Sequence, residues 1–315
     1  TISITGYEIG AISSISTQNN STNWRVTRLN SSSDNSFSNL PSANFIQYGY
    51  SNGGSISGTG NGILSGYNPG ELTKTYSNIP GTSKKVRKVY DGTSSTSSAN
   101  FGASTVTSTN GLSNNLNVTL SNQTYTYNAE GANDNITVTA DSAYTISSAS
   151  HNRHGNVYGL VASSTAKTIN DAQITQKSLS LSGTRNYDGT TIVSSSDLTI
   201  GNLVGNETLT LTLQGSGSLS SANTQSDSNF ASTSGLSLSN GSNGGVASNY
   251  TLIGGDHKVT VKRQPIKLSG SRKINRINRN LRLVSGDLRM ANKLQGDDVK
   301  LSGSTRIRVT REGVA

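Results

Sequence analysis

Residues 184–193 read TRNYDGTTIV, and residues 87–96 read RKVYDGTSST. The same Tyr-Asp-Gly-Thr core therefore occurs twice, with Tyr90 and Tyr187 separated by 97 positions. Three more segments recur in the same order: Tyr158 matches Tyr250 in context, LSLSGTRNYDG matches IKLSGSRKINR, and SDLTIGNLVGNETLTL matches GDLRMANKLQGDDVKL. Landmarks that repeat in order at a near-constant spacing predict tandem modules of about 90 residues.

The repeat period divides the chain into four parts. We expect an N-terminal β-rich region over residues 1–80, a first module over 81–176 and a second over 177–264. Residues 265–315 then form a partial, basic third module. This third copy has lost the signature, because Ile274-Asn275-Arg276 stands where the second module has Tyr-Asp-Gly.

The local pattern within the modules is that of β-strands. ETLTLTLQG, from Glu207, alternates Leu with Thr, which is the period-two pattern of a half-buried strand. We therefore expect an all-β or nearly all-β fold, made of tandem small β-modules in an elongated array with little helix. The two segments with a weak helical pattern are residues 170–177 and 274–290. Trp24, the single Trp, is expected to be a core anchor.

Composition excludes several kinds of protein. The chain has no Cys, which rules out disulfides and thiolate metal sites. It has no apolar run of the roughly 18 residues that a membrane-spanning helix needs, so we expect no membrane span. Charged residues make up 14% of the chain, which lacks the high charge typical of disordered proteins. Neutral polar residues take the place of charge, and they suit short strands joined by many turns.

The Tyr-Asp-Gly motif is interpreted as a structural turn. Asp-Gly between extended segments favours a type I′ hairpin turn, which needs positive φ at both central residues. The Asp side chain can also accept a hydrogen bond from the backbone N–H two residues later. Tyr would cover the core edge with its ring. The motif residues are Tyr90, Asp91, Gly92, Tyr187, Asp188 and Gly189.

No catalytic, cofactor-binding or metal-binding residues are predicted. His151 and His154 lie three positions apart, but the Gly and Asn around them indicate an exposed loop, and no carboxylate cluster accompanies them. His257 is expected on a strand. The many serines lack a recognisable base and nucleophile elbow, so we expect no enzyme activity.

The positive charge is concentrated at the C-terminal end. Residues 1–261 hold 12 basic and 13 acidic side chains, whereas residues 262–315 hold 14 basic and 4 acidic ones. This end either forms a solvated face of the partial module or contacts an anionic polysaccharide, lipopolysaccharide, DNA or an acidic subunit. It has no aromatic residue on which a base could stack, which disfavours nucleic acid. The candidate contact residues are Arg272, Lys273, Arg276, Arg279 and Arg282.

The motif Lys/Arg-x-Tyr-Asp-Gly-Thr, followed by DLTIGNLVGNETLTLTLQGSG and closed by VASNYTLIGGDHKVTV, resembles the YDG repeat domains of bacterial filamentous haemagglutinin-like adhesins. The resemblance is close over residues 177–264, weaker over 82–176, partial over 265–315 and absent from 1–80. It implies a secreted protein at the surface of Gram-negative bacteria, exported by the two-partner route through an outer-membrane transporter.

Three functions fit these observations. The preferred one is a structural and adhesive segment, whose modules form a stalk for surface or cell–cell attachment through a carbohydrate or protein receptor. The second is a self-assembling extracellular filament subunit, in which the half-module at the end exposes a sheet edge for strand addition by another chain. The third is a carbohydrate-binding module that serves an enzyme elsewhere in a longer polypeptide.

Overall fold

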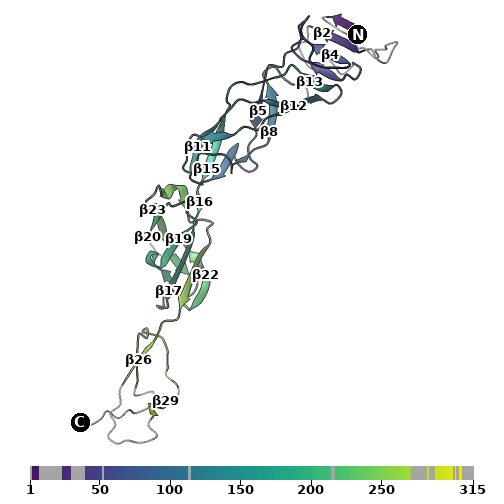
Figure 1. The fold of residues 1–315 in the computed structure, drawn as a ribbon. Coiled ribbons are helices and arrows are strands. Elements are labelled where there is room, and N and C mark those ends of the chain that lie inside the picture. Colours follow the sequence, from purple (N-terminus) through teal and green to yellow (C-terminus); the bar gives the residue numbers. More distant parts are fainter. Residues whose placement is uncertain are drawn as a thin grey trace, which may run out of the picture. The chain divides into compact units, whose positions relative to one another are not determined.

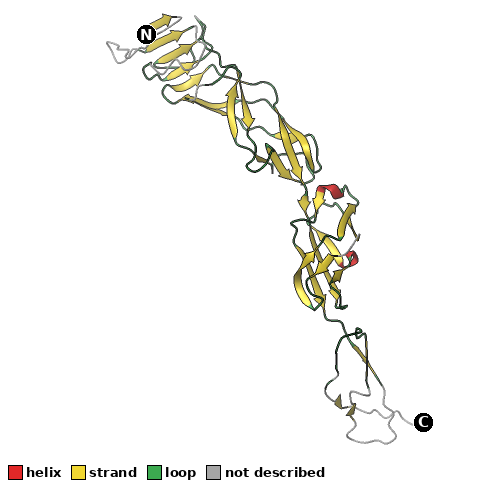
Figure 2. Ribbon diagram, turned by 180° about the vertical axis from the view of Figure 1, so that it is seen from behind, coloured by secondary structure: helices red, strands yellow, loops and turns green. Residues whose placement is uncertain are grey.

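The structure is a computed structural model that describes residues 2–6, 23–29, 40–51, 53–112, 115–213, 217–270, 282–283, 288–300, 302 and 305–306. The chain divides into two compact units, Thr1–Lys177 and Ser178–Ala315. Nearly all regular structure is β, as predicted (Figure 2). In the described residues the helical elements are two single 3-10 turns, η2 (Ser195–Asp197) and η3 (Ala247–Asn249).

The largest sheet of the first unit has seven strands. Five of them are parallel to one another, in the order β1-β2-β4-β3-β13, and β12 and β9 follow in antiparallel pairing. Because β13 pairs with β3, this sheet joins segments on both sides of residue 80. The strands are β1 (Ile2–Gly6), β2 (Trp24–Arg28), β3 (Phe45–Gln47), β4 (Gly62–Ser65), β9 (Leu116–Leu120), β12 (Ile146–His151) and β13 (Gly155–Tyr158).

Side chains of β2, β3 and β4 form a buried cluster that includes Trp24, Val26, Ile46 and Ile63. Trp24 is 5% exposed, so its expected role as a core anchor is confirmed. Apolar side chains of this kind each contribute about 1.5–3 kcal/mol when they are fully buried. The cluster therefore stabilises these parallel strands. The period-two pattern in the sequence did not predict their parallel pairing.

Two smaller sheets complete the first unit (Figure 1). In the five-stranded sheet, β6 is parallel to β15 and antiparallel to β7. Residues 170–175 belong to β15, so the weak helical pattern predicted there was wrong. The five strands are β10 (Tyr125–Tyr127), β11 (Asn133–Ala140), β15 (Thr168–Thr175), β6 (Val86–Val89) and β7 (Asn100–Phe101). The three-stranded sheet has β14 (Val161–Ala162), β5 (Glu71–Tyr76) and β8 (Ser104–Ser108).

The second unit is built around a six-stranded sheet in the order β18-β21-β22-β25-β17-β19. Its first long strand, β17, and its last, β25, are parallel neighbours. The sheet strands are β17 (Ser180–Asn186), β18 (Ile192–Val193), β19 (Leu198–Gly201), β21 (Gly217–Leu219), β22 (Gln225–Ser232) and β25 (His257–Lys262). The prediction that His257 lies on a strand is confirmed.

Shorter pairs flank the six-stranded sheet. β20 (Leu209–Leu213) is antiparallel to β23 (Leu236–Asn240), which confirms the strand predicted from the Leu and Thr alternation. β16 (Lys177–Ser178) lies at the boundary between the two units, and the Leu179 N–H that follows it donates to the Thr251 carbonyl of β24 (Tyr250–Thr251).

The residues after β25 form a strand pair that resembles the pair of β17 and β19. β26 (Lys267–Ser269) is antiparallel to β28 (Arg289–Ala291), with Leu268 opposite Met290. In the second module, Leu181 of β17 lies opposite Ile200 of β19. The repeats in the sequence match Leu181 with Leu268 and Ile200 with Met290, so the two pairs have the same register. A further short pair joins β27 (Arg282–Leu283) and β29 (Thr305–Arg306).

Candidate functional site: two buried cation turns

Both Tyr-Asp-Gly motifs begin where the first strand of a module leaves its parallel partner. The Tyr90 N–H donates to the Thr175 carbonyl over 2.9 Å, at the end of the β6 and β15 pair. The Tyr187 N–H donates to the Lys262 carbonyl over 2.8 Å, at the end of the β17 and β25 pair. The two motifs therefore occupy the same place in two modules.

The Asp of each motif accepts hydrogen bonds from the Thr two residues later. Oδ1 of Asp91 accepts the Thr93 N–H over 3.0 Å and the Thr93 hydroxyl over 2.9 Å. Oδ1 of Asp188 accepts the same two groups of Thr190, each over 2.9 Å. The predicted bond from the Asp side chain to the backbone two residues later is thereby confirmed.

The type I′ hairpin turn predicted for these motifs was wrong. A type I′ turn needs positive φ at both central residues. Here φ is positive at Gly92 (76°) and Gly189 (79°) but at neither Asp91 nor Asp188. The Asp-Gly pair does not close a two-residue loop either, because the chain runs from the end of β6 at Val89 to the start of β7 at Asn100. The side-chain bonds of Asp, rather than a hairpin, fix the turn.

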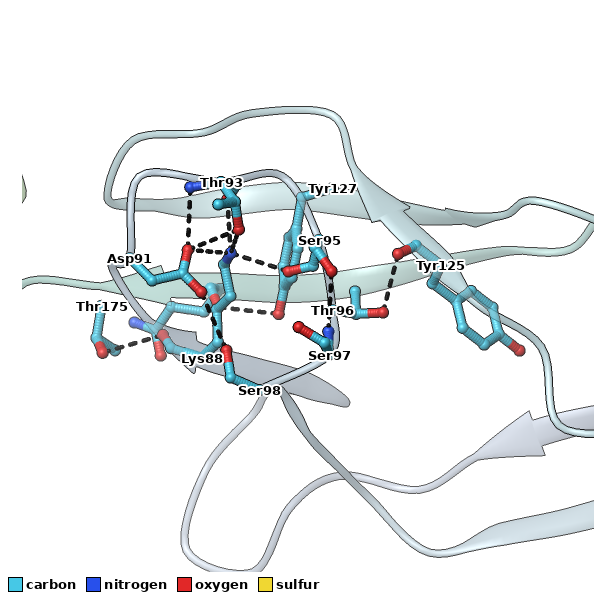
Figure 3. Close-up of polar contacts among 11 residues, drawn as sticks. Lys88, Asp91, Thr93, Ser95, Thr96, Ser97, Ser98, Tyr125, Tyr127 and Thr175 are labelled. Carbon is cyan, nitrogen blue, oxygen red and sulfur yellow. Dashed lines mark hydrogen bonds and ion pairs between the residues drawn. The ribbon is translucent and has the colours of Figure 1, made fainter. Parts of the chain in front are cut away.

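A buried Lys lies at the centre of the first turn (Figure 3). The Lys88 side chain is 0% exposed, and its Nζ lies 2.7 Å from Oδ1 of Asp91. The same ammonium donates to the carbonyls of Thr93 over 2.5 Å and Ser95 over 2.9 Å. It also lies 5.3 Å from the centre of the Tyr127 ring, within the range of a cation–π contact. We name Lys88, Asp91 and Thr93 the first cation turn.

An Arg takes the same position in the second turn. The Arg185 side chain is 5% exposed, and its Nη1 forms an ion pair with Oδ1 of Asp188. Its Nη2 donates to the Thr190 carbonyl over 2.5 Å. Arg185 Nε is buried, and among the described residues it has no hydrogen-bond partner. We name Arg185, Asp188 and Thr190 the second cation turn.

The electrostatics of both turns favour an ionised carboxylate. Burial by itself would raise the pKa of Asp91, but the hydrogen bonds from Lys88 and Thr93 and the charge of Lys88 outweigh it, so the pKa is lowered. Burial would likewise raise the pKa of Asp188, yet the hydrogen bonds from Thr190 and Arg185 lower it overall. A carboxylate with a lowered pKa is a weak base at neutral pH. The arrangement is suited to holding the backbone rather than to moving protons.

Sequence reasoning singled out Tyr, Asp and Gly but not the cation or the Thr as site residues. The sequence nevertheless contains a signal for both residues. Lys88 and Arg185 each lie two residues before the Tyr, and Thr93 and Thr190 each follow the Gly. Lys and Arg are rarely buried, so a pattern alone assigns them to the surface. Their repetition at fixed offsets is what could have identified them.

The two Tyr side chains differ in exposure. Tyr90 is 5% exposed and belongs to the buried residues of the first unit. Tyr187 is half-buried and packs against a cluster formed by Val193, Leu219, Val259 and Val261. Its hydroxyl donates to Oδ1 of Asp297 over 3.1 Å. The second motif therefore contacts the segment that follows its module.

The predicted basic contact residues lie largely outside the described part of the chain. Arg272, Lys273, Arg276 and Arg279 are not described, and neither is the altered signature at Ile274-Asn275-Arg276. Arg282 is the first residue of β27. The anionic partner remains a prediction.

The expectation of exposed histidines was wrong. His151 is 8% exposed and His154 is 0% exposed, and their rings lie 4.7 Å apart. Nδ1 of His154 accepts the Ala43 N–H over 3.3 Å, and Nδ1 of His151 accepts the Arg153 N–H over 3.0 Å. His151 therefore helps to satisfy the backbone of the turn between β12 and β13, and His154 satisfies a backbone N–H of the segment before β3. Across the described residues, no group of three or more His, Cys, Asp or Glu could hold a metal ion.

Comparisons with known proteins identify one domain. Within the described residues, no helix has the length and hydrophobicity needed to cross a membrane. No curated protein and no solved structure is significantly similar to the chain. The family model described as the YDG domain matches residues 167–261. A YDG domain is thus present over a range that contains the whole second cation turn.

Proposed function

We propose that the chain is a structural and adhesive segment of a secreted bacterial surface protein, in which tandem β-modules form a stalk for surface or cell–cell attachment. The observation that carries this proposal is the recurrence of the cation turn at the end of parallel first and last strands, in β6 with β15 and in β17 with β25. The resemblance of residues 177–264 to YDG repeats of adhesins supports the surface location.

The first cation turn supports a structural role because the donors of its cation are used within the turn. Lys88 binds one carboxylate and two carbonyls, which accounts for the three N–H donors of an ammonium. A motif that is internally satisfied has little capacity left to bind a ligand. In this proposal, attachment to a carbohydrate or protein receptor uses exposed Thr, Asn and Tyr side chains elsewhere on the modules.

Two measurements on the full chain test the two parts of the proposal. Small-angle scattering tests the stalk, and a compact globule as the best description of the data would refute it. Beads coated with the chain test attachment to bacterial and host cells, with uncoated beads as the control. Equal retention of coated and uncoated beads on all surfaces would refute the adhesive role but leave the stalk standing.

A filament subunit is the second candidate, and β26 favours it. In the second module, β17 lies between β25 and β19. β26 is the counterpart of β17, but in the part of the chain that the structure describes it pairs only with β28, the counterpart of β19. Its three residues are exposed, with Leu268 at 50%. An exposed strand edge can accept a strand from another chain.

Size-exclusion chromatography at several concentrations separates the two candidates. Strand addition between copies predicts an elution volume that falls as concentration rises. Leu268→Lys should suppress that change, because charged side chains on an edge oppose pairing. A monomer at all concentrations would count against the filament and leave the stalk as the better proposal.

A further inference from the structure

The second cation turn lies where the chain leaves the second module. β17 and β25 are parallel, and Asn186 at the end of one lies opposite Lys262 at the end of the other. Tyr187 then bonds to the Lys262 carbonyl. Whatever follows β25 therefore starts beside the Tyr-Asp-Gly turn.

Residues that follow β25 contact the turn directly. The Tyr187 hydroxyl donates to Asp297 over 3.1 Å, and this hydrogen bond raises the pKa of Tyr187. A Cβ added to Gly189 would lie 3.5 Å from Cδ1 of Leu294, at ordinary van der Waals distance. Beside these contacts is a cavity of about 670 Å³, lined by Tyr187, Arg263 and Lys293 among others. Leu294 and Asp297 also line this cavity, so the turn and the loop border the same space.

The contacting loop is the counterpart of a loop in the second module. The repeats match Asn202 with Asn292 and Glu207 with Asp297, and the strands before these loops, β19 and β28, also correspond. Asn202 and Asn292 both have positive φ, at 69° and 66°. Glu207 accepts the Tyr250 hydroxyl over 2.7 Å, as Asp297 accepts that of Tyr187. Residues 292–297 therefore belong to the start of the next repeat.

We propose that the Tyr-Asp-Gly turn of the second module is the docking site for residues 292–297 of the repeat that follows. The buried guanidinium of Arg185, paired with Asp188, holds the backbone in place. The outer side, the Tyr187 hydroxyl and the open face of Gly189, receives the loop. This role concerns how one repeat is oriented on the next, so it goes beyond attachment and does not depend on which surface the protein binds.

Hydrogen exchange on the full chain tests the docking contact. Tyr187→Phe and Asp297→Ala should each speed amide exchange of residues 288–300 about fivefold, as expected for the loss of one hydrogen bond. Exchange in β17 and β25 should stay unchanged. The matched control is Glu207→Ala, which removes the counterpart acid and its hydrogen bond with Tyr250 and should leave residues 288–300 unaffected. Unchanged exchange in both test variants would overturn the proposal.

Cross-linking gives an independent test because the chain has no Cys. Gly189→Cys with Leu294→Cys should be joined within one chain by a short thiol reagent. Gly205→Cys with Leu294→Cys is the control pair, since Gly205 also has positive φ but has no neighbour within 4 Å of its added Cβ. A yield no higher than that of the control pair would overturn the proposal. If Gly189→Cys prevents folding, the exchange experiment decides.

Discussion

The first and second cation turns hold the same backbone with different side chains. In the first, the compact ammonium of Lys88 is fully buried and contacts the Tyr127 ring. In the second, the planar guanidinium of Arg185 contacts the equivalent Asp, Asp188, and the Thr190 carbonyl. Its Nε has no hydrogen-bond partner among the described residues. The two turns therefore share an Asp, a Thr and a positive charge three residues before the Asp. They do not require the same cationic residue.

The Tyr residues differ in a complementary way. Tyr90 is buried within its unit, whereas Tyr187 is half-buried and bonds to Asp297 outside its module. The same motif thus supplies internal packing in one module and an outward contact in the other. Four experiments test how far this comparison holds, from the largest expected effect to the smallest.

Tyr90→Ala and Tyr187→Ala should separate the two turns most clearly. Tyr90→Ala should lower the free energy of unfolding by about 4 kcal/mol, because it removes a buried aromatic ring. Tyr187→Ala should cost about 1 kcal/mol, since its ring is already half-exposed. Urea unfolding followed by hydrogen exchange in each unit measures both effects. Equal losses would mean that the two Tyr residues play the same part.

Lys88→Met and Arg185→Met test the shared cation. Removing one partner of a buried ion pair leaves the other uncompensated, and Lys88→Met should cost about 3 kcal/mol. Arg185→Met should cost about 2 kcal/mol, because the Asp188 side chain is 51% exposed, against 36% for Asp91, and water can solvate it better. Denaturant midpoints give the comparison.

Lys88→Arg is the matched control for this experiment. It places the cation of the second turn in the first and should cost less than Lys88→Met, because it keeps the ion pair with Asp91. If Lys88→Arg were as costly as Lys88→Met, a positive charge alone would not be enough at this position. The conclusion that either cation can hold the turn would then be wrong.

Gly92→Ala and Gly189→Ala test the positive φ that the turns have in common. Each should cost about 1–2 kcal/mol, the strain of a left-handed conformation for a residue with a Cβ. Thermal unfolding of each variant beside the parent chain measures the loss. A neutral substitution at either position would show that the turn relaxes out of the positive-φ region there.

Acid should weaken both turns by a smaller amount. The pKa values of Asp91 and Asp188 are lowered in the folded state, so their contribution to stability is present above about pH 4, the unfolded value, and is lost as pH falls through the folded values. Unfolding midpoints measured from pH 6 to pH 2 should decline below pH 4. The double variant Asp91→Asn with Asp188→Asn should flatten part of that decline, and an unchanged slope would contradict the assignment.

The β fold could be predicted because its signal is local. Alternating Leu and Thr, for example, identified β20. The parallel pairing of β2, β3 and β4 could not be predicted, since short apolar segments do not specify their partners. Residues 170–175 looked weakly helical, but the burial of Ala172 and Ile174 in the sheet decided the outcome.

The candidate site could be predicted only in part. Asp and Gly are typical turn residues, so the turn itself was recognisable. The burial of Lys88 depends on acceptors that the turn creates, and these exist only after folding. His151 and His154 lie among Asn and Gly, which indicates a loop, but burial depends on what packs over that loop. Contacts such as that between His154 and Ala43 join positions too distant in sequence to be read from the pattern.

The parallel pairing of β17 with β25 also has a mechanical consequence. Tension applied where the chain enters at Ser180 and leaves at Lys262 would slide these strands past each other. It would strain their six register pairs together rather than open them one at a time. Forced unfolding is controlled by the rate of crossing that barrier and not by equilibrium stability. A module of modest stability can therefore withstand a strong pull, provided that the pull is brief.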